Sequence, residues 1–169
     1  MLLSFTPALA SQTRTPLKTT PLSVCEILDH SKDWDNQVVL IKAHYGSGME
    51  DSFLWDERCQ GREIELEYPD GADRDDRSLH DLAYKHRIRV ELNEDKNVKD
   101  FEKLVSAKDG MCQKQDVLLE AVGRVDTRRQ FEEKNPNCRL DFGMCNYSAR
   151  FVLESVKEVR ATNTKPKCK

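Results

Sequence analysis

The sequence lacks the short motifs that mark most families of enzymes. It contains no phosphate-binding loop of the GxxxxGK(S/T) type, no GxSxG nucleophile elbow and no HExxH metal motif. Its six cysteines include no CxxC pair, and its four histidines do not combine with them in the spacing of a zinc site. We therefore predict a protein that is not an enzyme and that has no cofactor and no metal site.

Long hydrophobic runs and an excess of positive charge are also missing. No run is long enough for a helix to cross a bilayer, so we expect no membrane span. The 27 basic and 30 acidic side chains give a formal net charge of -3. Proteins that bind nucleic acids are more often basic, because contacts to phosphates dominate their affinity. We therefore expect a ligand or a protein as partner rather than a nucleic acid. The 169 residues are enough for one domain, which we expect to be a monomer.

The first residues resemble part of a secretory signal. An apolar run extends from Leu2 to Leu9, and the sequence Ala8-Leu9-Ala10 fits a cleavage site of the A-x-A type. A charged start to the run is missing and Pro7 interrupts it, so the run is either a weak signal or the end of one that begins upstream. Residues 11–20 are polar and form a linker. This segment, residues 1–20, predicts a secreted or periplasmic protein.

Six cysteines are many for a chain of this length and indicate disulfides formed in an oxidising compartment. The alternative is a reduced protein with buried thiols. Loop cysteines reach the geometry of a bridge more easily than a cysteine on a helix, such as Cys25. We therefore expect at least one bridge among the loop cysteines, with Cys168 of the tail free or variable. The loop cysteines are Cys59, Cys112, Cys138 and Cys145.

Residues 21–68 predict a short helix followed by three strands. Ser23 and Glu26 have the spacing of a capping box, so we expect a helix over residues 21–30, ended by a polar turn over residues 31–36. Hydrophobic and polar residues then alternate over residues 38–45, 52–56 and 63–68, which is typical of strands with one buried face. Strands this close in the sequence form a meander rather than a βαβ unit.

Residues 69–115 form a charged insertion before the last strands. Within it, residues 88–92 alternate as a strand does, and residues 98–107 have the spacing of a helix. Strands are expected over residues 116–125, where Gly123 indicates a bend or bulge, and over residues 148–159, for which a helix is the alternative. Residues 161–169 form a polar, basic tail.

Several short sequences resemble a known fold. They are Ile27-Leu28, residues 38–43, Leu54-Trp55-Asp56 with Cys59, residues 122–125 (VGRV), and Phe142-Gly143 before residues 148–153. In this order they resemble the OB-fold, and in particular the uncharacterised secreted bacterial proteins with OB-like domains. The resemblance implies a mainly β protein with short helices, in which residues 21–160 form a five-stranded barrel. It also implies that one face of the barrel binds an oligonucleotide, an oligosaccharide or a protein.

Aromatic and basic residues on the predicted strands form a candidate binding face. Tyr45, Trp55 and Tyr68 lie on three successive strands, and Arg124 and Arg128 lie on or just beyond another. If they converge, the rings would stack on a ligand and the arginines would hold phosphate. The alternative is that the three aromatic residues belong to the core. We predict a secreted, non-catalytic binding or interaction domain. The alternatives are an oligonucleotide- or oligosaccharide-binding module and, third, a hydrolase.

Overall fold

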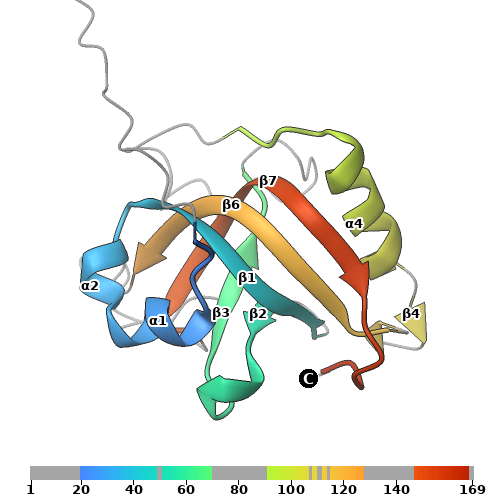
Figure 1. Ribbon diagram of the computed structural model, residues 1–169, viewed down its shortest axis with the longest axis horizontal. Helices are drawn as coiled ribbons and strands as arrows, with labels where there is room; N and C mark the ends of the chain where they lie inside the picture. Colours follow the sequence, from blue (N-terminus) through green and yellow to red (C-terminus); the bar gives the residue numbers. More distant parts are fainter. Residues whose placement is uncertain are drawn as a thin grey trace, which may run out of the picture.

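Five strands close into a barrel in this computed structural model, which describes residues 20–48, 51–69, 91–106, 108–109, 112–113, 115–127 and 147–167. Around the barrel the order is β1-β2-β3-β7-β6 (Figure 1). β1 pairs antiparallel with β2 and β6, whereas β3 and β7 are parallel. The mainly β, OB-like barrel predicted from the sequence is confirmed. The strands are β1 (Val38–Ser47), β2 (Ser52–Trp55), β3 (Glu63–Glu67), β6 (Val117–Thr127) and β7 (Ala149–Ala161).

The hydrophobic residues that alternate along the strands meet in one core, as the pattern predicts. Successive side chains of a strand point to opposite faces, so every second residue faces the barrel interior. Residues 117–127 form a strand and not a helix, and residues 149–161 likewise form a strand rather than the alternative helix. The inward residues of β1, β3 and β6 include Val39, Ile41, Ala43, Ile64, Leu66, Val117, Leu119 and Ala121.

The predicted N-terminal helix is present as α1 (Val24–Asp29). The side chain of Ser23 accepts a hydrogen bond from the backbone N–H of Glu26 at 3.2 Å, and the Ser23 backbone N–H donates to the Glu26 carboxylate at 2.8 Å. This capping box satisfies donors that the first turn leaves unpaired. A second short helix, α2 (Ser31–Trp34), follows where we expected a polar turn.

The insertion contributes a helix that covers part of the barrel. α4 (Lys96–Ser106) begins after Asp95, whose carboxylate accepts from two backbone N–H groups of the first turn, and it packs against β7 (Figure 1). A two-stranded hairpin of β4 (Lys108–Asp109) and β5 (Cys112–Gln113) follows. Of the strand predicted over residues 88–92, residues 88–90 lie outside the described residues, and residues 91–92 are not in a strand. No helix in the described ranges has the length and apolar character needed to span a membrane.

Gly123 marks an irregularity in β6, as its place in the strand predicts. The register between β6 and β7 shifts between Val122 and Gly123. A Cβ atom at position 123 would lie 2.3 Å from the carbonyl oxygen of Val152 and 2.6 Å from the ring of Phe151. Glycine therefore allows the backbones of β6 and β7 to approach closely at this bulge.

Candidate functional site

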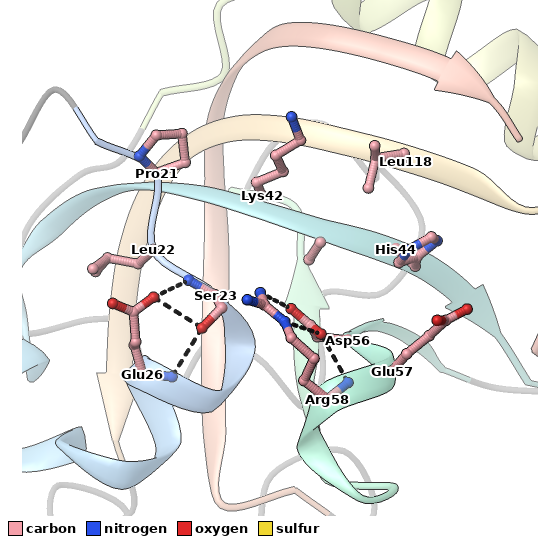
Figure 2. A pocket seen from close by; sticks show the side chains of 11 residues that line it. Pro21, Leu22, Ser23, Glu26, Lys42, His44, Asp56, Glu57, Arg58 and Leu118 are labelled. Carbon is pink, nitrogen blue, oxygen red and sulfur yellow. Dashed lines mark hydrogen bonds and ion pairs between the residues drawn. The ribbon is translucent and has the colours of Figure 1, made fainter.

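A pocket of about 520 Å³ lies on the outer surface of the barrel, between the start of α1, β1 and a short 3-10 helix, η1 (Glu57–Cys59) (Figure 2). Its lining combines acidic and basic side chains with one imidazole, so it suits a polar ligand more than an apolar one. The lining residues are Pro21, Leu22, Ser23, Glu26, Lys42, Ala43, His44, Asp56, Glu57, Arg58 and Leu118.

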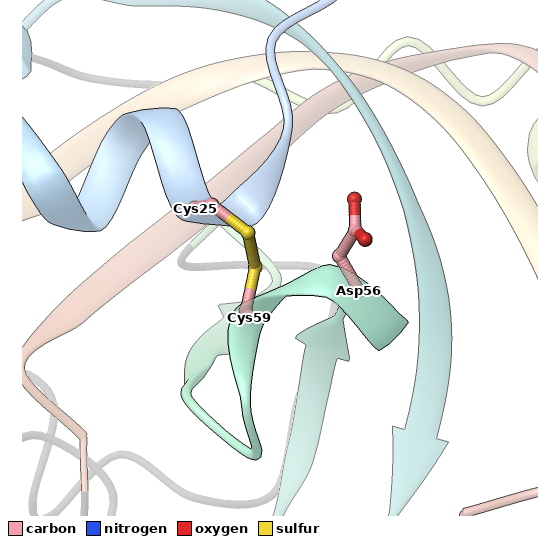
Figure 3. A group of neighbouring side chains, drawn as sticks. All are labelled: Cys25, Asp56 and Cys59. Carbon is pink, nitrogen blue, oxygen red and sulfur yellow. A yellow bond between two sulfur atoms is a disulfide. The ribbon is translucent and has the colours of Figure 1, made fainter.

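A disulfide joins two walls of this pocket. Cys25 of α1 is bonded to Cys59 of η1, and their Cα atoms are 5.2 Å apart (Figure 3). We expected at least one bridge among the four loop cysteines and ranked the helical Cys25 lower. The ranking of Cys25 is wrong, because it is the partner of Cys59. α1 is short and lies beside η1, so the barrel itself brings the two Cα atoms within the range of a bridge. The side chains of the other three candidates, Cys112, Cys138 and Cys145, lie outside the described residues.

Hydrogen bonds hold the rim of the pocket on the η1 side. The carboxylate of Asp56 accepts from the Arg58 backbone N–H at 2.9 Å and forms an ion pair with the Arg58 guanidinium at 2.6 Å. The hydrogen bond from the Arg58 side chain lowers the pKa of Asp56, although partial burial opposes this change. Asp56 therefore remains ionised at neutral pH and is a weak base.

A histidine–aspartate pair connects the pocket to the residue that precedes β6. His44 of β1 lies 2.7 Å from Asp116, measured between Nδ1 and Oδ2. The Asp116 side chain is fully buried, and the hydroxyl of Thr162 also donates to its Oδ2. The other carboxylate oxygen, Oδ1, has no hydrogen-bond partner within the part of the chain that the structure describes. Asp116 thus fixes the orientation of an imidazole that lines the pocket.

The ring of His44 also contacts an aromatic surface beside the pocket. We call this surface the outer β2–β3 face, and it consists of the residues of β2 and β3 that alternate with the inward-facing Leu54, Ile64 and Leu66. The centroids of the His44 and Trp55 rings are 4.7 Å apart. The outer β2–β3 face comprises Phe53, Trp55, Glu63, Glu65 and Glu67.

Basic side chains from distant parts of the chain neutralise the glutamates of the outer β2–β3 face. Lys167 places its ammonium 2.5 Å from Glu63 and 5.3 Å from the centroid of the Trp55 ring. Arg150 of β7 is 5% exposed and lies 2.8 Å from Glu65. Although Glu63 and Glu65 lie on the outer side of the barrel wall, both are largely buried. Buried carboxylates require such partners, because a charge is costly to remove from water.

The structure does not bring the predicted aromatic residues together on one face. Tyr45 lies in the barrel core, where its ring packs edge-on against Phe101, and burial raises the pKa of its phenol. Tyr68 is half-buried against the same core, and burial raises its pKa as well. Trp55 points to the opposite face. The core alternative therefore holds for the two tyrosines. Trp55 lies on the outer side of the barrel wall, where it is 8% exposed and belongs to a second buried cluster with Phe53 and Tyr147.

The predicted basic residues are not assembled beside Trp55. Arg124 of β6 donates a hydrogen bond to the backbone carbonyl of Asn36 at 2.7 Å, and its guanidinium lies 3.9 Å from Glu154. These contacts use Arg124 to join β6 to the segment before β1 and to β7. Arg128, the second predicted phosphate contact, lies outside the described residues.

Within the described ranges, one group of side chains has ligand atoms close enough for a metal ion. It consists of Cys25, Asp56 and Cys59, whose sulfur and oxygen atoms lie within 4.8 Å of one another. A thiolate is the form of cysteine that binds metals, and both sulfurs are bonded to each other here. In the disulfide-bonded state this cluster therefore links α1 to η1 and offers no thiolate to a metal ion.

Comparisons with models of protein families, with curated proteins and with solved structures found no match. Function is therefore inferred from the residues themselves. The His44–Asp116 pair is the feature that sequence reasoning missed. The two residues of the pair are 72 positions apart in the chain. The sequence could have indicated this pair only if the register between β1 and β6 were known, because that register places the two residues side by side.

Proposed function

We propose that the protein is a secreted, non-catalytic domain that binds its ligand or partner on one continuous outer surface. The surface consists of the pocket and the adjoining outer β2–β3 face. The observation that carries the proposal is the position of His44, which lines the pocket and contacts Trp55 at 4.7 Å. The polar pocket provides groups that orient a ligand, and the buried indole of Trp55 supports the His44 ring from behind.

The pocket is preorganised for binding. The capping box at Ser23 holds one side, the Asp56–Arg58 pair holds the other, and the disulfide joins the two. A ligand therefore loses less of its binding free energy to ordering the site. The disulfide also supports secretion, because such bonds persist in oxidising compartments. The resemblance to secreted bacterial OB-like proteins supports the same assignment.

The glutamates of the outer β2–β3 face argue against an oligonucleotide ligand. OB-folds bind oligonucleotides on the face of their second and third strands. In this barrel that face carries Glu63, Glu65 and Glu67, and their carboxylates already engage the neighbouring cations Lys167 and Arg150, which leaves neither cation available to phosphates. The net charge of -3 acts in the same direction. An oligosaccharide, which carries no such charge, is the alternative ligand on this surface.

Hydrolysis is a second candidate function, which the His44–Asp116 pair favours. An imidazole held at Nδ1 by a buried carboxylate can act as a general base. The hydroxyl that lines the same pocket belongs to Ser23, and it already donates to the Glu26 carboxylate at 2.9 Å and accepts from the Glu26 backbone. A nucleophile that serves as a helix cap is poorly placed to react, so binding is the better supported function.

The test is a titration of isotope-labelled protein with amino acids, oligosaccharides and nucleotides, followed by NMR. We expect bound compounds to shift the resonances of Lys42, His44 and Trp55, and Lys42→Ala to weaken binding several-fold. Lys99→Ala, which removes an exposed lysine from α4, is the matched control and should have no effect. Binding that maps to another surface would refute the proposal. Ester hydrolysis that is lost in His44→Ala would favour the hydrolase instead.

A further inference from the structure

The C-terminal segment, residues 162–167, runs from the start of β6 to the outer β2–β3 face. At its beginning, the backbone N–H of Thr162 donates to the Asp116 carbonyl at 2.8 Å, and the Thr162 hydroxyl donates to the Asp116 carboxylate. At its end, Lys167 reaches Trp55 and Glu63. Among the described residues, no hydrogen bond or ion pair joins residues 163–166 to the barrel. The segment is therefore held at two points, Thr162 and Lys167.

The groups that receive Lys167 suit a primary ammonium ion. Glu63 has a side chain that is 5% exposed, and its carboxylate lies 2.5 Å from the Lys167 nitrogen. The same nitrogen lies over the face of the Trp55 ring at 5.3 Å from its centroid. The negative face of an indole attracts a cation, and this attraction grows where water is excluded. The Glu63 carboxylate and the face of the Trp55 indole therefore suit a small cationic group.

Lys167 is the exchangeable cation of this face. Its side chain is 32% exposed, whereas that of Arg150, which pairs with the neighbouring Glu65, is 5% exposed. Arg150 also belongs to β7, so it cannot leave without opening the barrel. Apart from Lys167 itself, the described part of this segment is anchored to the barrel at Thr162, so withdrawal of Lys167 does not require the barrel to open.

We propose that Trp55 and Glu63 form a recognition site for the ammonium group of a lysine side chain. In the resting domain Lys167 fills the site, and a lysine-bearing polypeptide displaces it in the complex. A polypeptide is favoured because the present occupant is a lysine carried by a chain segment without helix or strand structure. This proposal rests on the proposed function and specifies the class of partner that the outer β2–β3 face would bind.

The test compares the full chain with its Lys167→Met variant, which retains an unbranched side chain but no charge. The probe is an acetylated and amidated hexapeptide with the sequence TNTKPK, that of residues 162–167. A second peptide with norleucine in place of both lysines is the uncharged control. Binding is followed through the indole N–H resonance of Trp55, for which the described part of the chain offers no hydrogen-bond partner.

We expect Lys167→Met to bind the lysine peptide roughly fivefold or more tightly than the natural chain, because the competing side chain is gone. The norleucine peptide should bind about tenfold more weakly, and adding Glu63→Gln should weaken binding of the lysine peptide to a similar extent. Lys165→Met removes a cation of the same tail that makes no ion pair among the described residues, so it should behave as the natural chain does.

Equal affinities of Lys167→Met, Lys165→Met and the natural chain would overturn the proposal, as would equal binding of the two peptides. The peptide experiment and the titration with small compounds test different claims, so one can give a negative result without the other. If compounds shift Lys42 and His44 but the lysine peptide does not bind, the proposed function stands and the lysine site is wrong. If neither binds, both are wrong.

Discussion

Breaking the Cys25–Cys59 disulfide should lower the free energy of unfolding by about 4 kcal/mol. The two cysteines are 34 residues apart, so the bridge closes a loop of that size in the unfolded chain. Treated as loss of loop entropy, a loop of roughly 34 residues reduces the entropy of the unfolded state by about 13 cal/mol/K, which is about 3.8 kcal/mol at 25 °C. For a domain of this size, that corresponds to a fall in melting temperature of roughly 10 °C.

The measurement is urea unfolding of three variants under oxidising conditions: Cys25→Ala, Cys59→Ala and the double variant. Either single substitution removes the whole bridge, so the double variant should be little less stable than either single one. Cys59 is 1% exposed, so its truncation adds a small cavity and should cost about 1 kcal/mol more than truncation of Cys25. Single variants that each lose less than about 1 kcal/mol, or losses that simply add in the double variant, would refute this reasoning.

Two further predictions concern the bulge in β6 and the ion pair beside the pocket. Gly123→Ala should destabilise the protein by roughly 2–4 kcal/mol in urea unfolding. The new Cβ would lie 2.3 Å from the carbonyl oxygen of Val152, and a backbone atom can move only if the strand moves with it. A loss below about 0.5 kcal/mol would contradict the close approach of the two strands. The Arg58 hydrogen bond lowers the pKa of Asp56 below its ordinary value of 3.8, so the stability that this pair contributes is present above that pH and is lost as the pH falls through the lowered pKa. The stability difference between the natural chain and Asp56→Asn should therefore be constant above about pH 5 and shrink below about pH 4; a difference unchanged down to pH 2 would be inconsistent with the pair.

The elements of the fold were determined locally, by patterns that the sequence displays. The spacing of Ser23 and Glu26 is enough to start α1, because a capping box involves residues of a single turn. Alternation along β1 and β6 is enough to identify strands and their inward faces, because one side of each must avoid water. Gly123 predicted the bulge for the same reason, since the lack of a side chain is a local property.

The candidate site was decided by the tertiary structure, because each of its contacts joins residues far apart in the chain. Alternation shows that Phe53 and Trp55 share a face, but closure of the barrel places Leu54 inside and leaves Trp55 outside, beside Lys167. The pairing of Cys25 with Cys59 depends on where α1 packs, and that of His44 with Asp116 on the register of β1 and β6. Such contacts have no local signal, because their free energy arises only when distant strands have closed the barrel around one core.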